Sequence, residues 1–101
     1  MIARIWRGWT TAAQAEAFEG HVRRQLPTIQ AQSGYCGLTL LRLDEGEEVQ
    51  FVTVTTFASM DDVVAFAGPN HTEAVIPPAL RQTLHRVGGA VEHYEVVLKD
   101  G

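Results

Sequence analysis

The chain has 101 residues, of which 46% are hydrophobic and 20% are charged, and its formal net charge is −4. This length fits a single domain over residues 1–101, and no repeat, charge block or low-complexity tract interrupts it. The acidic balance, with eight scattered basic residues, disfavours a nucleic-acid partner. No apolar run approaches the ~20 residues that span a bilayer, and residues 1–7 do not resemble a secretory signal, so we expect no membrane partner and a cytoplasmic location.

Residues 2–8 predict the first strand. Successive side chains of a strand point to opposite faces, so each face of this segment receives one alternating set of residues. One face carries Ile2, Arg4 and Trp6, and the other carries Ala3, Ile5 and Arg7. Both faces are therefore partly apolar.

The first helix is predicted to begin at the capping box formed by Thr11 and Gln14. Apolar residues then recur at intervals of three and four, which places them on one stripe of a helix. They are Ala15, Phe18, Val22, Leu26 and Ile29. Pro27 lacks an N–H group and clashes with the preceding turn, so we expect a kink or a break near Gln25 and Leu26.

Two further strands are predicted over residues 37–43 and 49–57, joined by the charged connector 44–48. A glycine-containing connector between apolar runs is typical of an antiparallel hairpin with a longer loop, so these strands should pair directly. In the first of these strands, Leu38 and Leu40 point to one face and Leu41 and Leu43 to the other. In the second, Val52 and Val54 point to one face, and Val49, Phe51 and Phe57 point to the other.

The second helix is predicted to follow Ser59, whose hydroxyl suits an N-cap, and to end at Gly68. Residues 70–76 are expected to form a further short helical stretch that Pro77 and Pro78 close. Residues 79–86 are expected to add another turn or two. A last strand is predicted over residues 91–98, and it too has apolar side chains on both faces.

All four predicted strands carry bulky apolar residues on both faces, although only two helical segments are available to cover them. A single sheet under one helical layer normally presents a polar face to water. The pattern therefore predicts a self-associating subunit with a pocket on its helical side.

The order strand, helix, strand, strand, helix, strand is the split βαβ (βαββαβ) arrangement of α+β ferredoxin-like folds, with a four-stranded antiparallel sheet. The sequence resembles the antibiotic biosynthesis monooxygenase (ABM) domain family over nearly its whole length. The segments that carry the resemblance are MIARIWRG at 1–8, FASMD at 57–61, AFAG at 65–68, PP at 77–78 and VEHYEV at 91–96. The resemblance implies a homodimer in which two sheets pack face to face as a dimeric α/β barrel, with a ligand cavity between each sheet and its own helices.

The resemblance also implies an activity, a cofactor-independent monooxygenase acting on a small aromatic or quinol-like substrate. Such an enzyme needs an apolar pocket that holds an electron-rich phenol or enol and stabilises its anion, because the substrate itself supplies the electrons for dioxygen. No cofactor is then expected. One alternative is a non-catalytic dimeric module that binds a small hydrophobic or aromatic ligand.

A haem-degrading monooxygenase is a second alternative, because some family members carry out that reaction. Those members use an Asn on the first strand, a Trp on the pocket helix and an axial His further along. Trp6 and Phe66 fall at the first two positions, and Ile76 or Pro77 falls at the position of the iron ligand. Haem chemistry therefore ranks below the cofactor-free reaction.

Arg4, Trp6 and Phe66 are the predicted substrate-binding residues. The resemblance places the face that Arg4 and Trp6 share toward the helices. There Trp6 offers a stacking surface and Arg4 a cation that would lower the pKa of a bound phenol. The alternative is that Trp6 belongs to the core and that Arg4 extends to the rim.

His71 and His93 are the predicted catalytic residues, because a histidine is the natural proton acceptor near neutral pH. The alternatives are an exposed loop position for His71 and a hydrogen-bonded core or interface position for His93. The four histidines lack the spacing of a metal site, so no metal is expected. Cys36, the single cysteine, is expected to be a small buried residue and not a nucleophile.

Overall fold

The computed structural model describes residues 1–101. Along the chain it contains β1 (Ile2–Thr11), α1 (Ala15–Gln30), β2 (Tyr35–Glu45), β3 (Glu48–Phe57), α2 (Met60–Ala67), α3 (Pro78–Arg81), β4 (Arg86–Val87) and β5 (Glu92–Glu95). The strands form one antiparallel sheet in the order β2-β3-β1-β4, and β5 also pairs with β1. The predicted α+β ferredoxin-like order is confirmed, but the sheet has five strands and not four, because the two-residue strand β4 pairs with β1 ahead of the predicted last strand.

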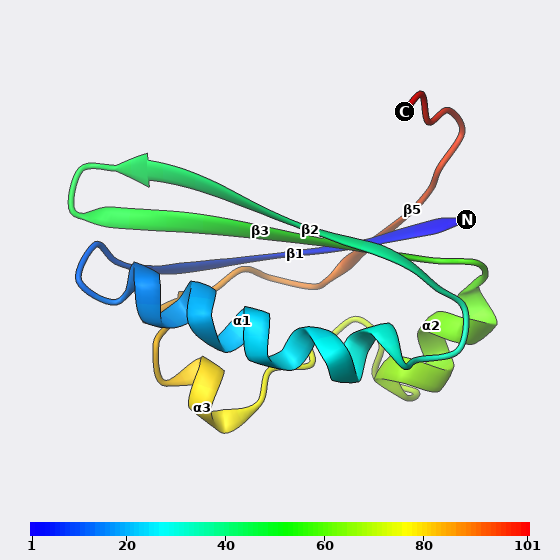
Figure 1. The fold of residues 1–101 in the computed structure, drawn as a ribbon, viewed down its shortest axis with the longest axis horizontal. Coiled ribbons are helices and arrows are strands. Elements are labelled where there is room, and N and C mark those ends of the chain that lie inside the picture. The colour runs from blue at the N-terminus through cyan, green and yellow to red at the C-terminus, as the bar shows by residue number, and fades with distance from the viewer.

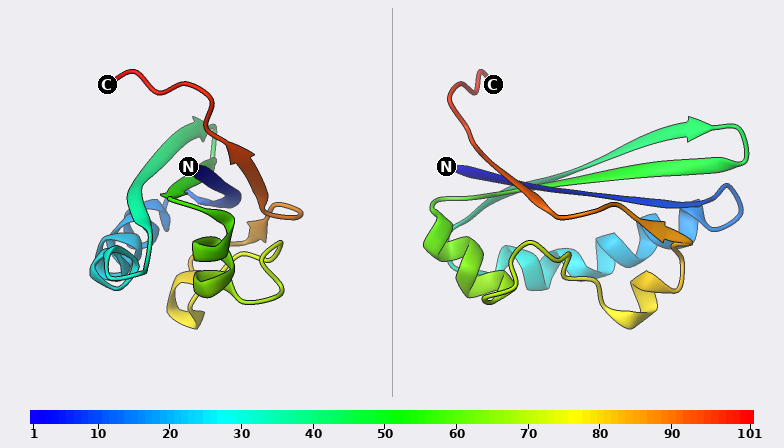
Figure 2. Two further views of the ribbon diagram at one scale, coloured as in Figure 1. Left: turned by 90° about the vertical axis from the view of Figure 1, so that its right-hand side faces the viewer. Right: turned by 180° about the vertical axis from the view of Figure 1, so that it is seen from behind.

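The helices lie on one face of the sheet, as Figures 1 and 2 show. No helix covers the opposite face, and the chain beyond β5 rises on that uncovered side. The sheet therefore has a covered face and an open face. No helix of the structure has both the length and the apolar character needed to span a membrane.

The hydrophobic core lies between α1 and the covered face. Every second residue of β3 from Val49 to Phe57 is buried, because alternate side chains point toward the helices. Phe18 of α1 stacks on Phe51 of β3 with 4.4 Å between ring centroids. The apolar stripe predicted for the first helix is thus the one that packs on the sheet.

The start and the middle of α1 differ from the prediction. The helix begins at Ala15, because Thr11 still belongs to β1 and accepts the N–H of Gln14 in an intervening turn. It then continues through Pro27 to Gln30, so of the predicted kink or break the break is wrong. Pro27 sits in the last turn, where its missing N–H removes a single helical hydrogen bond and few residues remain to be disrupted.

The hairpin between β2 and β3 is confirmed, but its turn is tighter than predicted. Only Gly46 and Glu47 separate the paired residues Glu45 and Glu48. Gly46 has φ +68°, the positive value that the first position of such a two-residue turn favours and that glycine adopts without strain.

The segment 70–76 contains turns and irregular backbone in place of the predicted helix. The backbone carbonyls of His71 and Glu73 accept hydrogen bonds from the Arg4 side chain, and Thr72 accepts one from Val91. Tertiary hydrogen bonds therefore replace helical ones here. In place of the helical turns predicted over residues 79–86, the only helix after this segment is α3. The strand predicted over residues 91–98 is limited to β5.

Cys36 is exposed, so its predicted burial is wrong. The pairing of β2 with β3 steps from Tyr35 opposite Phe57 to Gly37 opposite Thr56, which leaves Cys36 as the extra residue of an irregularity. An extra residue leaves the regular alternation of the strand, and this explains why the pattern misplaced the thiol.

Candidate ligand-binding site

A cavity lies between the covered face of the sheet and the helices. Its volume is about 120 Å³, comparable to the engineered cavity of about 150 Å³ that binds benzene in another protein. The hydrophobic residues of its wall are Trp6, Val22, Ile29, Leu38, Phe66, Val75 and Leu80. Arg4, Thr53 and Thr55 add polar groups from the sheet. The three predicted substrate-binding residues all line this cavity.

Arg4 is only 2% exposed, so it does not extend to the rim. Its Nη1 donates to the backbone oxygen of His71 and to Nε2 of His93, the latter at 2.8 Å, and its Nη2 donates to the backbone oxygen of Glu73 at 2.8 Å. The Phe66 ring centroid lies 5.9 Å from the guanidinium carbon.

None of the ion pairs in the structure includes Arg4. Burial lowers the pKa of the Arg4 guanidinium, although an arginine remains charged at neutral pH. A buried charge is costly unless another charge compensates it. The site therefore holds a buried cation for which the chain provides no acid.

Trp6 combines the two positions that the sequence left open. It packs against the core cluster, with its ring edge-on to Phe18 at 6.3 Å between centroids, and it also lines the cavity. The indole thus belongs to the core on one side and to the cavity wall on the other.

The two predicted catalytic histidines converge on Arg4. His93 lies opposite Arg4 in the pairing of β5 with β1, and the ring centroids of His71 and His93 are 5.3 Å apart. We call these three residues the Arg4 cluster. Neither histidine is among the residues that line the cavity.

The hydrogen bonds constrain the His93 ring. Arginine only donates, so Nε2 of His93 must accept, and its hydrogen is assigned to Nδ1. Burial, followed by the charges of Arg4 and His71, lowers the pKa of His93, which keeps it neutral at pH 7. His71 differs, because its Nδ1 is buried and has no hydrogen-bond partner.

Thr53 is a site residue that the sequence analysis missed. It lies opposite Trp6 in the sheet, is 6% exposed, and its buried Oγ1 has no hydrogen-bond partner. The available signal was the pair Thr53 and Thr55 on the face of β3 that also carries Val49 and Phe51. A polar residue on a face assigned to the core marks a hydrogen bond or a ligand.

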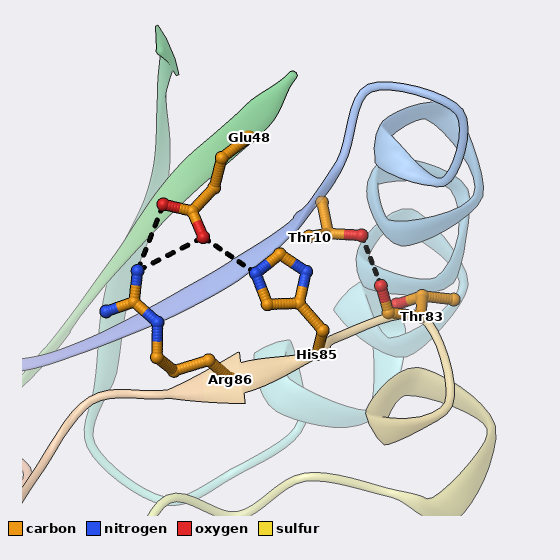
Figure 3. A network of polar contacts seen from close by, with 5 residues as sticks. All are labelled: Thr10, Glu48, Thr83, His85 and Arg86. Carbon is orange, nitrogen blue, oxygen red and sulfur yellow. Dashed lines mark hydrogen bonds and ion pairs between the residues drawn. The ribbon is translucent and has the colours of Figure 1, made fainter. Parts of the chain in front are cut away.

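A second polar group lies near the other end of β1, and we call Glu48, His85 and Arg86 the Glu48 cluster (Figure 3). The Glu48 carboxylate accepts from Nε2 of His85 at 2.7 Å and from Nη2 of Arg86 at 3.0 and 3.1 Å. These hydrogen bonds, that of His85 first, lower the pKa of Glu48. Arg86 also stacks on Trp9, with its guanidinium carbon 3.9 Å from the ring centroid.

Comparison with solved structures identifies the class of fold. The haem degrader MhuD from Mycobacterium tuberculosis is 24% identical, with a TM-score of 0.68 and complete coverage of both chains. SnoaB, a cofactor-independent oxygenase from Streptomyces nogalater, is 22% identical, with a TM-score of 0.63 and coverage of 97% of this chain and 95% of its own. A Nitrosomonas europaea protein provisionally assigned as an antibiotic biosynthesis monooxygenase is 16% identical, with a TM-score of 0.69 and coverage of 97% of this chain and 100% of its own.

The chain thus has the fold of these ABM-domain proteins, and the resemblance found in the sequence is confirmed at the level of the fold. Searches with protein-family models and among curated proteins give no match.

The cavity residues do not fit haem. MhuD has been crystallised with two haems in its active site, and haem iron in proteins is held by His, Cys, Met or Tyr. None of these residue types lines the cavity of this chain, and Pro77 lies in its wall. No residue of the wall can therefore provide an axial ligand.

Proposed function

We propose that the protein is a cofactor-independent monooxygenase that oxidises a small phenol or quinol-like aromatic molecule. The observation that carries this proposal is Arg4, a buried cation without an acidic partner at the wall of an apolar cavity. A cation in such a place lowers the pKa of a bound phenol and stabilises the phenolate. The fold shared with SnoaB, a cofactor-independent oxygenase, supports the same reaction class.

The proposed reaction converts a phenol and O₂ into a quinone and water. The phenolic O–H bond and the C–H bond on the opposite ring carbon are broken, and four electrons pass from the substrate to O₂. One oxygen atom forms the new C=O group, and the other leaves as water with both hydrogens. Since the substrate is the reductant, no other electron donor is required.

The residues have different parts in this proposal. Trp6 of β1 and Phe66 of α2 contact the aromatic ring of the substrate, and Arg4 binds the phenolate oxygen. His71, which lies behind Arg4 and does not line the cavity, is the proposed acceptor of the phenolic proton, because its Nδ1 has no other partner. His93 acts through Arg4, since its Nε2 already accepts from the guanidinium and keeps that group in place.

Oxygen uptake with a panel of phenols and quinols tests the proposal. We expect uptake above the buffer rate, transfer of one atom of ¹⁸O₂ to the product, and loss of uptake in Arg4→Met and in the double variant Trp6→Ala/His71→Ala. His85→Ala is the matched control, because His85 is an exposed histidine of the Glu48 cluster, and it should keep the activity. Uptake equal to that of buffer, or activity that survives in the double variant, contradicts the proposal.

A non-catalytic binding module is the second candidate. It is favoured by the absence of any histidine or carboxylate among the residues that line the cavity, which leaves no proton acceptor at the wall itself. A binding module would be stabilised by aromatic ligands without consuming oxygen. A ligand-dependent rise in Tm in the absence of turnover would therefore favour this candidate.

We also propose that a second copy of the chain covers the open face of the sheet. Apolar side chains on this face and in the chain after it remain exposed, and they include Leu41 at 50%, Leu43 at 55%, Val97 at 91% and Leu98 at 85%. Monomeric proteins rarely leave an apolar patch of this kind in water. Sedimentation of the full chain should show a homodimer, and Leu41→Glu should produce monomers.

A further inference from the structure

The fold buries four threonines, Thr10, Thr53, Thr55 and Thr83, and two of them, Thr53 and Thr55, line the cavity. Thr10 donates its hydroxyl hydrogen to the backbone oxygen of Thr83 (Figure 3), and Thr83 donates its own to the backbone oxygen of Leu80 at 2.6 Å. The Thr53 Oγ1 is fully buried and has no such partner, although Thr53 is one of the residues that line the cavity. Its neighbours in the sheet, Trp6 and Leu40, carry no acceptor that could replace one.

A buried hydroxyl without a hydrogen bond destabilises the folded protein. A threonine at this position is explained if a ligand provides the missing partner. Valine has nearly the same shape and would fill the same space without that cost.

Arg4 gives an independent sign of the ligand. Its hydrogen bonds use three of the five N–H donors of a guanidinium, which leaves Nε–H and one hydrogen of Nη2 for another acceptor. These donors belong to a cation that lacks an acid, so the acceptor they suit best is an anionic oxygen.

Arg4 and Thr53 lie at separate positions of the cavity. The Arg4 guanidinium contacts His93 of β5, the strand that pairs with one edge of β1. It also contacts the backbone oxygens of His71 and Glu73. Thr53 belongs to β3, which pairs with the other edge of β1. Arg4 and Thr53 therefore approach the cavity from the two opposite edges of β1.

We infer that the cavity binds an aromatic anion with two separate oxygen functions. Arg4 binds the anionic oxygen, and the Thr53 hydroxyl forms a hydrogen bond to a second hydroxyl or carbonyl oxygen elsewhere on the ring. Thr53 is then a specificity-determining residue that selects dioxygenated rings over those with one oxygen function. This inference rests on the proposed function for the location of the site, but it concerns binding and not oxidation.

Two probes that differ by a single hydroxyl test the inference. Calorimetric titration of the full chain with 4-hydroxybenzoate and with benzoate should give a lower Kd for 4-hydroxybenzoate, by roughly three- to tenfold for one hydrogen bond. In Thr53→Val this preference should disappear while the Kd of benzoate stays the same. The unliganded Thr53→Val protein should unfold at the same temperature as the parent or at a higher one.

Thr10→Val is the matched control, because Thr10 is also a buried threonine of the sheet but its hydroxyl is bonded. It should lower Tm and keep the preference for 4-hydroxybenzoate. The inference is overturned if Thr53→Val keeps the preference, if it lowers Tm as Thr10→Val does, or if the parent protein binds neither probe or binds them equally.

The ring carbon opposite the hydroxyl of 4-hydroxybenzoate carries its carboxylate, so the proposed oxidation cannot convert the probe to a quinone. Its Kd can therefore be measured whether or not the protein consumes oxygen. A failure of oxygen uptake with a retained preference would reject the proposed activity alone, and the reverse result would reject only the role of Thr53.

Discussion

The Arg4 cluster and the Glu48 cluster lie near opposite ends of β1 and combine arginine with histidine in opposite ways. In the Glu48 cluster a carboxylate accepts from both His85 and Arg86, and all three side chains reach solvent. In the Arg4 cluster the guanidinium is buried and contacts an imidazole and two backbone carbonyls, but no carboxylate. Arg86 and His85 therefore have an acidic partner within the chain, at one end of β1. Arg4 has none at the other end.

This difference separates a structural role from a binding role. Exposed ion pairs contribute little to stability, and the Glu48 cluster mainly connects β3 to the segment around β4. A buried cation without a counter-charge destabilises the folded state, so its presence calls for another explanation. An anionic ligand in the adjacent cavity provides one.

Removal of each arginine should have the largest and most unequal effects. Arg4→Met should weaken binding of 4-hydroxybenzoate by about 100-fold or more, because it removes a desolvated partner of the anion. Arg86→Met removes an arginine of the other cluster and should leave the Kd nearly unchanged. Calorimetric titration of both variants measures the contrast, and equal Kd values for the two would remove the distinction between the clusters.

Replacement of His93 should have an intermediate effect and should show which acceptor Arg4 needs. His93→Leu leaves an Nη1 hydrogen of Arg4 without an acceptor, which should cost about 1–3 kcal/mol of unfolding free energy. His93→Gln retains an acceptor oxygen and should lose less. Chemical denaturation at pH 7 compares the two variants, and equal losses would mean that the hydrogen bond to Arg4 is unimportant.

The titration of His93 should also make stability depend on pH. Its pKa in the folded protein lies below the ordinary value of 6.5, so the unfolded chain binds more protons between the two values. The unfolding free energy should therefore decrease as the pH falls below 6.5, and this decrease should level off below the folded pKa. A parallel series with His93→Gln should lack this contribution, and identical profiles would contradict the assignment.

The smallest effect is expected for Glu48→Gln. The pKa of Glu48 is lowered in the folded protein, so its contribution to stability is present above the ordinary value of 4.5 and is lost as the pH falls through the folded pKa. The variant should have a slightly lower Tm at pH 7, a weaker loss of Tm in acid, and an unchanged Kd for 4-hydroxybenzoate. A large change in that Kd would show that the two clusters are coupled.

The sequence by itself was sufficient for the order of the main helices and strands up to α2. Alternation along residues 49–57 separated the two faces of β3, and the structure shows that the face of Val49 and Phe51 packs on α1. The spacing of Ala15, Phe18 and Val22 identified the face of α1 that meets it. Ser59 was recognised as an N-cap, and its hydroxyl accepts the N–H of Asp62. These features depend on local geometry, in which a residue's own position in a helix or strand decides its direction.

The sequence also indicated Arg4, Trp6 and Phe66 as residues of one pocket, but the relations between them required the tertiary structure. Arg4 and His93 are 89 positions apart, and only the pairing of β5 with β1 makes them neighbours. The backbone of residues 71–73 departs from the expected helix because it accepts hydrogen bonds from Arg4.

The missing partner of Thr53 and the missing acid of Arg4 are properties of the space around those side chains. A pattern of residue types records which groups are present, and hydrogen bonds and charge compensation depend on which groups meet. The amino-acid order therefore determined the strands, the helices and their apolar faces. The tertiary structure decided which polar groups remain available to a ligand.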